Sequence, residues 1–174
     1  MPAVLETERL LFRPHILADL DAWCAMEMDA DVRRYVGGSP RTREEAERRF
    51  PRLQEQIANG LAVWAAIYKP ENKYIGRCGI YQHLDQNGEP LPGEAALGVY
   101  IAKDYWGRGL ATEATSAFVD FGFNRLGMRR IVTMVQVGND ASVRVMEKIG
   151  LSVERIETGA YRSFYHFVIE NPNI

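Results

Sequence analysis

The sequence has little cysteine, no long hydrophobic run and no excess of positive charge. Its two cysteines, Cys24 and Cys78, form neither a CxxC pair nor a cysteine–histidine metal motif, so we expect reduced, buried thiols and no metal site. No apolar run approaches the roughly 20 residues of a transmembrane helix, and the first ten residues lack a signal-peptide pattern. The formal net charge is -2, with basic residues scattered among acidic ones. We therefore expect a soluble, cytoplasmic protein that binds neither membranes nor nucleic acid.

The sequence does contain enough apolar residues for one hydrophobic core. At 174 residues it fits one domain, residues 1–174, and is too short for two domains of ordinary size. Apolar residues make up 47% of the chain, which supports a core without disulfides. Both a monomer and a homodimer are compatible with these features.

The apolar spacing switches between the strand period and the helix period, which predicts a mixed α/β fold. Helical spacing over Leu17–Met28, and a Thr42–Glu45 capping box before Ala46–Ile57, predict two helices ahead of the main sheet. We expect Pro51 to kink or split the second helix. The predicted strands are Arg9–Arg13, Ala62–Tyr68, Tyr74–Gln82, Glu94–Ile101, Ile131–Val137 and Tyr165–Ile169, and the later helices follow Gly109 and span Asn139–Ile149.

Two polar stretches lie outside this pattern. The segment His83–Gly93 is long and rich in turn-forming residues, so we expect a functional or mobile loop there. The arginines of the second helix, Arg48, Arg49 and Arg52, are interpreted as its solvated face.

A glycine-containing segment, Trp106–Ala111, lies between a predicted strand and a predicted helix. Backbone amides and the helix dipole attract anions at such a position, and Gly107 and Gly109 allow a tight turn and a close approach of phosphate oxygens. A dinucleotide fingerprint needs glycine where Thr112 stands, and the sequence has no GxxxxGK[ST] run, so nicotinamide and nucleoside triphosphate chemistry are disfavoured. A phosphate-binding turn and a plain strand-to-helix turn both remain open.

Three stretches of the chain carry a family resemblance. Leu5–Pro14 resembles the opening strand, Ala95–Ala114 the acetyl-CoA motif and Asn139–Leu151 the N-x-x-[AS] helix of the RimJ/RimL-like branch of the GCN5-related N-acetyltransferase (GNAT) superfamily. The resemblance implies a GNAT fold, with a central, mostly antiparallel, splayed sheet of about six to seven strands flanked by about four helices. It also implies transfer of an acetyl group from acetyl-CoA to a primary amine, on a protein amino terminus or a small molecule.

The resemblance places acetyl-CoA along two segments. The pantetheine arm is expected to pair with the backbone of Val99–Ile101, and the pyrophosphate to lie on Trp106–Thr112. Trp106 stands where the superfamily has glutamine or arginine, as is familiar in the RimJ/RimL-like branch, while Gly109 and Ala111 match the pattern. The residues expected to contact acetyl-CoA are Val99, Tyr100, Ile101, Trp106, Gly107, Arg108, Gly109, Leu110, Ala111, Thr112, Asn139 and Ser142; Asn139 also suits a helix N-cap.

Acetyl transfer from a thioester to an amine needs a neutral amine, a group that stabilises the oxyanion, and a proton for the departing thiolate. A backbone amide within Val99–Ile101 is expected to stabilise the oxyanion. Ala96 stands where many members of the branch carry glutamate, so Glu94, on the same sheet face, is the candidate base, directly or through water. Met146 stands where many members carry tyrosine, so Ser142 is the candidate acid, with a purely structural role in the helix cap as its alternative.

The same two departures, Ala96 and Met146, motivate a second hypothesis, a non-catalytic module that binds CoA. His15, His83 and His166 match no family site and are interpreted as structural or exposed. The acceptor stays open among a protein amino terminus, a polyamine, an antibiotic amine and a small metabolite, because the fold does not distinguish them.

Overall fold

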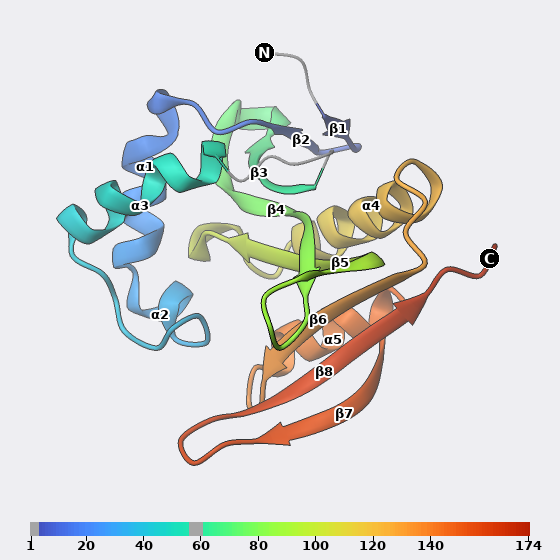
Figure 1. Ribbon diagram of the computed structural model, residues 1–174. Coiled ribbons are helices and arrows are strands. Elements are labelled where there is room, and N and C mark those ends of the chain that lie inside the picture. Colours follow the sequence, from blue (N-terminus) through green and yellow to red (C-terminus); the bar gives the residue numbers. More distant parts are fainter. Residues whose placement is uncertain (1–3, 56–60) are drawn as a thin grey trace.

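The computed structural model describes residues 4–55 and 61–174, which form one mixed β-sheet with helices packed against it. Its eight strands are β1 (Leu5–Glu6), β2 (Leu10–Arg13), β3 (Ala62–Tyr68), β4 (Lys73–Leu84), β5 (Pro90–Ile101), β6 (Arg130–Gln136), β7 (Ser152–Thr158) and β8 (Ser163–Glu170). The five α-helices of these residues are α1 (Leu20–Met28), α2 (Ala30–Arg33), α3 (Arg43–Glu55), α4 (Leu110–Asn124) and α5 (Asp140–Lys148). The strands lie in the order β1-β2-β3-β4-β5-β6-β8-β7, and neighbours are antiparallel except for the parallel pair β5–β6 (Figure 1).

The expected α/β class, with a mostly antiparallel, splayed sheet, is confirmed for the described residues. They contain eight strands rather than six to seven, and five α-helices rather than about four. The additional strands are β1, which has two residues, and β7, whose residues are all exposed. The four-residue helix α2, capped by Asp29, was also not predicted. None of the three shows the repeated apolar spacing by which a sequence reveals buried elements.

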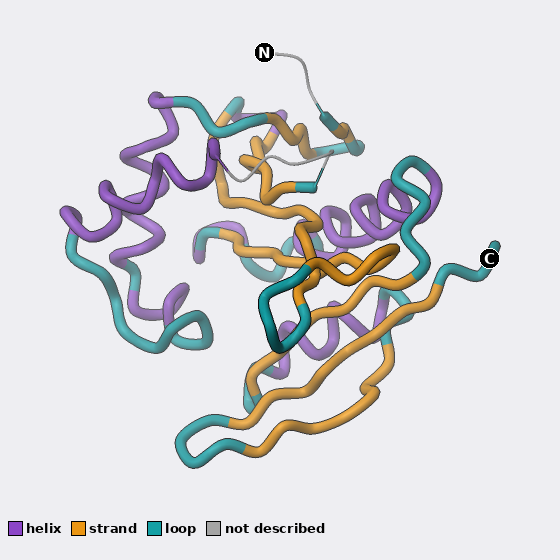
Figure 2. Tube along the Cα trace, viewed as in Figure 1, coloured by secondary structure: helices purple, strands orange, loops and turns teal. Residues whose placement is uncertain are grey.

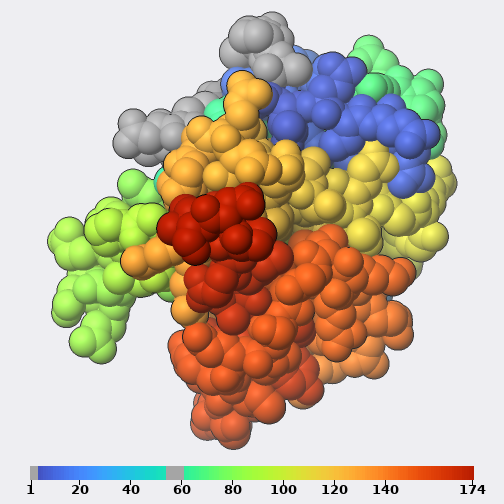
Figure 3. All heavy atoms as spheres, turned by 90° about the vertical axis from the view of Figure 1, so that its right-hand side faces the viewer, coloured from blue at the N-terminus to red at the C-terminus, as the bar shows by residue number. Residues whose placement is uncertain are grey.

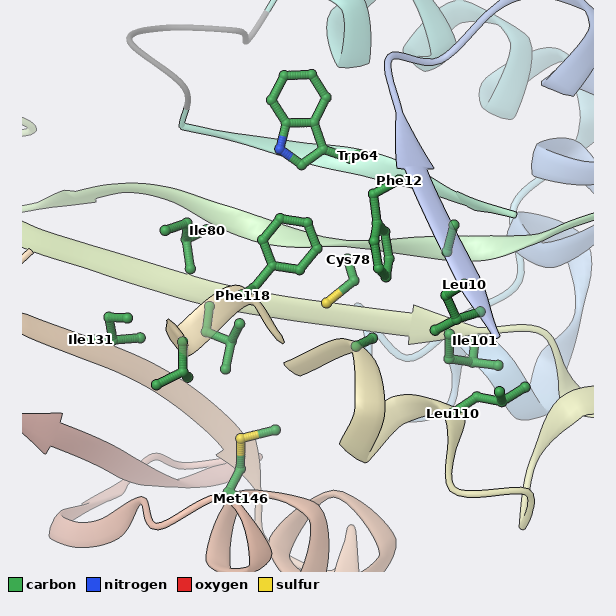
Figure 4. Packing of buried hydrophobic residues seen from close by; sticks show 14 of the residues in the cluster. Leu10, Phe12, Trp64, Cys78, Ile80, Ile101, Leu110, Phe118, Ile131 and Met146 are labelled. Atoms are coloured by element: carbon green, nitrogen blue, oxygen red, sulfur yellow. The ribbon is translucent and has the colours of Figure 1, made fainter. Parts of the chain in front are cut away.

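The helices form two layers on opposite faces of the sheet (Figures 1 and 2). Successive residues of a strand point to opposite faces, and β3 shows the result. Trp64 packs in the same core cluster as Phe118 of α4, while Ala65 packs with Met26 of α1. Figure 4 shows the α4 side of the sheet, where the rings of Phe118 and Phe12 meet edge to face with centroids 4.8 Å apart.

Several predicted elements are confirmed. The chain crosses from β5 through α4 to the parallel strand β6, which is the predicted βαβ unit. Ala114 and Phe118 of α4 are fully buried, as their shared helical face requires. Gly150 follows α5 with a left-handed φ of 89°, as expected for a residue that terminates a helix. Cys24 and Cys78 are free and buried.

The segment His83–Gly93, expected to be a loop, is mostly strand. β4 extends to Leu84 and β5 begins at Pro90, so only the tip between them is a turn. The Asp85 side chain holds that tip, since its Oδ1 accepts hydrogen bonds from the amides of Asn87 at 2.8 Å and Glu89 at 2.9 Å. The turn-forming residues predicted the tip correctly. The strand residues on either side of it were not predicted, because few of them are apolar. Figure 3 shows this hairpin, in light green, projecting from the body of the molecule.

Helix α3 forms with its predicted cap. The amide of Thr42 donates to the Glu45 carboxylate at 2.8 Å, and the Glu45 amide donates to Thr42 Oγ1 at 3.2 Å. Of the two effects expected at Pro51, a split does not occur, because α3 runs through Pro51 to Glu55. A proline removes one helical hydrogen bond, and the bonds on either side are enough to continue the helix here. Ile57 lies outside the described residues. No helix of the described residues has the length and apolar character needed to cross a bilayer.

Candidate functional site

Strands β5 and β6 pair over a short stretch and then separate. Glu94–Ala96 lie opposite Arg130–Val132, and beyond this point the two strands continue without pairing to each other. Where they part, Thr133 Oγ1 donates a hydrogen bond of 2.8 Å to the Leu97 carbonyl. Val99–Ile101 therefore pair with β4 on one side and border the gap, which we call the β5–β6 opening, on the other.

At the open end, each of these two strands leads into the N-terminus of a helix. Gly109 is the N-cap of α4 with φ 77°, and Gly107 has φ 73°, a left-handed conformation that favours glycine. A Cβ built on Gly107 would meet none of the described atoms within 4 Å, so the glycine loop (Trp106–Thr112) leaves room for a bound group. Asn139 is the N-cap of α5, and its side chain accepts from the Ser142 amide at 3.3 Å. First-turn amides lack intrahelical acceptors and favour anions, so this end of the opening suits negative charge.

The glycine loop is fixed by side chains on both sides. Arg9, just before β2, donates from Nη1 to the Arg108 carbonyl at 2.9 Å. Trp106 Nε1 donates to the Ile101 carbonyl at 2.7 Å, which ties the loop to the end of β5. The loop is thus held in shape with its glycines facing solvent. Among the residues predicted here, Trp106, Gly107, Arg108 and Gly109 are exposed, Ala111 and Thr112 are partly buried, and Leu110 is buried.

A cavity of about 680 Å³ follows the β5–β6 opening. Its walls come from β4, β5, the tip of the hairpin between them, β6, β7, β8, α5 and the segment after α2. Of the predicted site residues it brings together Val99, Tyr100, Asn139 and Ser142. Lining residues that the sequence did not indicate include Tyr35, Val36, Tyr81, His83, Phe164 and His166, which reach the cavity only through the tertiary arrangement of distant segments.

Helix α5 forms one wall of the cavity. Met146 is buried and points from α5 toward the sheet (Figure 4). Its thioether has no acidic proton. Ser142, one turn earlier, also lines the cavity, and its hydroxyl is the nearest proton-bearing side chain along that face of the helix.

The candidate base Glu94 is connected to the cavity through His83. Glu94 is not among the described residues that line the cavity, whereas His83 is. The two side chains meet, with His83 Nδ1 3.0 Å from Glu94 Oε2, next to a bulge in β4. Arg129 lies 3.5 Å from the other carboxylate oxygen, and Arg130 Nε lies 3.9 Å from Oε2. The carboxylate is thus anchored by cations on one side and bonded to an imidazole ring that borders the cavity.

The other two histidines have different surroundings. His166 on β8 lines the cavity from beyond β6, with Nε2 2.8 Å from Glu157 Oε2. His15 is buried against α1, and burial lowers its pKa to about 4. His15 thus has the structural placement expected from the sequence, whereas His83 and His166 belong to the cavity.

The cavity carries little negative charge. Among its described lining residues, Asp85 is the only carboxylate and Arg155 the only arginine or lysine. The Asp85 oxygens already accept hydrogen bonds from the hairpin tip. The described residues also contain no group of three or more histidine, cysteine, aspartate or glutamate side chains arranged to hold a metal ion.

Behind the opening, a buried charged network joins α1 to β4 and β5. The Arg77 guanidinium lies between the rings of Trp23, 4.3 Å from its centroid, and Tyr100, 4.2 Å from its centroid. Arg77 also donates to Glu27 of α1 at 3.0 Å. Because Tyr100 lines the cavity, this network fixes the strand on which the opening depends.

Comparison with known proteins places these features in a family. Residues 9–152 match the model of the acetyltransferase (GNAT) domain. An uncharacterized N-acetyltransferase, p20, of Bacillus licheniformis is 30% identical over 86% of this chain and 83% of its own. An uncharacterized protein, YkkB, of Bacillus subtilis is 32% identical over 71% of this chain and 69% of its own.

Solved structures show the same fold. A GNAT-family acetyltransferase from Bacillus anthracis superposes with a TM-score of 0.82 at 24% identity, covering 96% of this chain and 98% of that one. A spermidine N-acetyltransferase from Vibrio cholerae, in complex with CoA and spermine, has a TM-score of 0.77 at 18% identity, over 95% and 97% of the two chains. A ribosomal-protein-S5-alanine acetyltransferase from Vibrio fischeri has a TM-score of 0.76 at 19% identity, over 97% and 96%.

Proposed function

Because the chain belongs to the GNAT acetyltransferase family and is an acetyl-CoA-dependent N-acetyltransferase, we propose that its acceptor is the α-amine of a peptide or protein, as in the RimJ/RimL-like branch. The observation that carries this proposal is the single carboxylate, Asp85, among the described lining residues of the cavity. A polyamine carries several positive charges, and desolvating each of them requires a nearby opposite charge. An α-amine brings one charge only.

The rest of the cavity lining supports the same acceptor. Tyr35, Val36, Leu84 and Phe164 provide apolar surface at its walls, which suits the side chains and backbone that follow a peptide amino terminus. The spermidine enzyme of Vibrio cholerae and the alanine acetyltransferase of Vibrio fischeri share the fold at similar TM-scores, so the fold alone does not choose between the two acceptors.

The residues at the opening fit acetyl-CoA. The glycine loop and the first turn of α4 would hold the pyrophosphate on backbone amides, since glycine φ values and an unobstructed approach are both present. The free edge of Val99–Ile101 would pair with the pantetheine amides and present a backbone N–H to the oxyanion. Leu97 presents its carbonyl to the β6 side and Ala102 its amide to β4, so within Val99–Ile101 the backbone groups of Val99 and Ile101 face the free edge. The Ile101 carbonyl is already bonded to Trp106, so we place the pairing at Val99. Acetyl-CoA supplies the acyl group to be transferred.

We assign the base to His83, positioned by Glu94. Histidine is the side chain that most often serves as a general base. With Nδ1 bonded to the Glu94 carboxylate at 3.0 Å, the imidazole would use Nε2 to take a proton from the ammonium form of the acceptor, directly or through water. Glu94 would then act through the ring, whereas the sequence predicted Glu94 itself as the base, directly or through water.

We assign the proton returned to the CoA sulfur to Ser142 or to water held by it. Ser142 lines the cavity on α5, while the buried Met146 stands where the family resemblance leads one to expect a tyrosine. A serine hydroxyl is a weak acid, so its contribution would come from its position beside the sulfur and from relaying a proton from solvent.

Replacing Gly109 with valine is expected to abolish the thermal stabilisation that acetyl-CoA gives to the protein. Gly109 has φ 77°, where a β-branched residue is strained, and it begins the helix whose first amides would hold the pyrophosphate. Ligand at about 100 times its Kd stabilises a folded protein by about 2.7 kcal/mol, which a melting curve detects. A folded variant that keeps the full acetyl-CoA shift would place the pyrophosphate elsewhere.

The acceptor itself is tested by measuring release of the CoA thiol across matched amines. We expect peptides with a free α-amine to be acetylated with kcat/KM at least about tenfold above the same peptides with a blocked terminus and a lysine, because roughly a tenth of an α-amine is neutral at pH 7 and far less of a lysine amine. Spermidine should be no better than the blocked peptides. A preference for spermidine would contradict the proposed acceptor, and CoA binding without turnover of any amine would favour a non-catalytic module.

A further inference from the structure

A second pocket, remote in sequence from the glycine loop, lies between α3 and the segment that joins α2 to α3. Its volume is about 470 Å³. Five of its nine lining residues are arginines and one is a carboxylate, among the residues that the structure describes. We call it the arginine pocket; its lining consists of Arg33, Gly37, Ser39, Pro40, Arg41, Glu45, Arg48, Arg49 and Arg52.

The inner wall of the arginine pocket is built by two guanidinium groups that share one buried carboxylate. Arg33 Nη1 lies 3.4 Å from Glu27, and Arg41 also contacts that carboxylate. Glu27 receives Arg77 as well, at 3.0 Å, so one negative charge faces three positive charges. The Arg33 side chain is only 6% exposed and that of Arg41 21% exposed. Burial lowers the pKa of Arg33, as expected for a cation that lacks enough counter-charge.

The outer wall adds cations without adding matching anions. Arg48 forms one exposed ion pair with Glu44. Among the side chains that the structure describes, neither Arg49 nor Arg52 has an ion-pair partner. The pocket's own carboxylate, Glu45, accepts the Thr42 amide and is used in the cap of α3. If these arginines formed only the solvated face of α3, their clustering around one pocket would be unexplained.

The composition of the pocket points to phosphate. Arginine presents its donors as a planar fork that binds phosphate or carboxylate through two parallel hydrogen bonds, and this pocket contains arginine with no lysine. A phosphate monoester carries a charge of about -1.5 to -2 at neutral pH. The five arginines of the pocket face the carboxylates of Glu45 in its lining and of Glu27 behind it, and a phosphate matches the remaining positive charge better than a single carboxylate does.

We propose that the arginine pocket binds a phosphate-bearing small molecule at a site separate from that of acetyl-CoA. The loop that closes the pocket over Gly37–Arg41 continues directly from Tyr35 and Val36, which line the large cavity. The bound phosphate is held by Arg49 and Arg52 from α3, with Arg41 at the back of the pocket.

Titration calorimetry with pyrophosphate, in a buffer free of phosphate and sulfate, tests the proposal. Gly109→Val serves as the background, because under the proposed function it removes binding of pyrophosphate at the glycine loop. We expect Arg49→Gln/Arg52→Gln in that background to weaken pyrophosphate binding at least about tenfold, because two charge-assisted contacts are lost. The matched control, Arg125→Gln/Lys148→Gln, removes two exposed charges from the ends of α4 and α5 and should leave the affinity unchanged.

The possible outcomes separate the two phosphate sites. No pyrophosphate binding in the Gly109→Val background would overturn the proposal, and so would binding that the Arg49→Gln/Arg52→Gln pair leaves intact. Equal weakening by the control pair would also count against it, since the effect would then follow net charge. A last experiment titrates CoA into Arg49→Gln/Arg52→Gln with the native Gly109. Normal CoA affinity supports a separate site. A loss of CoA affinity would assign the pocket to a phosphate of CoA itself and would contradict the proposal.

Discussion

Glu27→Gln is expected to lower the free energy of unfolding by about 3–5 kcal/mol, the cost of leaving buried charge without its partner. Glu27 is 2% exposed, and its carboxylate contacts Arg33, Arg41 and Arg77. The amide that replaces it would keep the shape of the side chain while leaving three guanidinium groups with no opposing charge from that position. Urea denaturation followed by circular dichroism measures the difference.

The matched control is Asp21→Asn. Asp21 pairs with Arg43 on the surface of the same helical layer, where both side chains are exposed. Exposed pairs contribute about 0–1 kcal/mol, so this variant should be nearly as stable as the parent. Similar losses for the two variants would mean that burial of the Glu27 network adds nothing, which would contradict the prediction.

The effect of Glu27→Gln should also depend on pH. Burial by itself raises the pKa of Glu27, but the charges of Arg77, Arg33 and Arg41 outweigh it, so the net pKa lies below its ordinary value of 4.5. A carboxyl group with a depressed folded pKa stabilises the protein above its unfolded pKa and loses that contribution as pH falls through the folded pKa. The difference in free energy of unfolding between parent and variant should therefore be largest at pH 6–7 and should shrink in acid below about pH 4.5. A difference that stays constant into acid would assign the loss to packing.

The second large effect concerns catalysis: His83→Gln should lower kcat for an α-amine peptide about 10²-fold at pH 7. This is the lower end of the range for general-base catalysis, because part of an α-amine is already neutral at that pH. Raising the pH to 9 should shrink the deficit to less than about tenfold, since the acceptor then loses its proton to water. The measurement is initial rate against pH at saturating acetyl-CoA. Glu94→Gln, which leaves the ring in place but removes its charged partner, should show a smaller loss with the same pH recovery.

His166→Gln is the matched control for this prediction. Both histidines line the cavity and both meet a glutamate, but His166 lies on β8, beyond β6, while His83 is bonded to the reacting strand β5. We expect His166→Gln to retain at least about a third of the parental kcat. The reverse ranking would place the base on the other side of the opening.

Ser142→Ala should lower kcat more than about tenfold, because it affects the proton returned to sulfur. In contrast to His83→Gln, the loss should be the same at every pH.

Sequence reasoning predicted the parts of the fold that depend on local patterns. The cap at Thr42, the helical face of Ala114 and Phe118, and the left-handed Gly150 each follow from neighbours within a few residues. Strand β7 was not predicted, because its residues are all exposed and show no buried face. The glycine loop, in contrast, could be located from the sequence, because its shape is set by its own glycines and by the helix that follows.

The parts of the site that depend on tertiary contacts could not be predicted. A bulge in β4 lies beside His83, whose ring bonds to Glu94, and no spacing rule within either strand contains that contact. The surplus charge around Glu27 likewise comes from α2, from the segment before α3 and from β4 together. Each arginine separately resembles an ordinary surface residue, and only the fold reveals that they share one carboxylate.

The short pairing of β5 with β6 has a consequence for ligand binding. Among the described residues, strand pairing between one half-sheet, β1 to β5, and the other, β6 with β8 and β7, is limited to Glu94–Ala96 and Arg130–Val132. The covalent route between the halves runs through α4, so no hairpin turn bridges the wide end of the gap. The halves are otherwise joined through side chains, since Leu97, Ile131 and Phe118 belong to one core cluster. An extended ligand that pairs with the free edge of β5 would continue the backbone hydrogen bonding of that edge past the point where β6 leaves it.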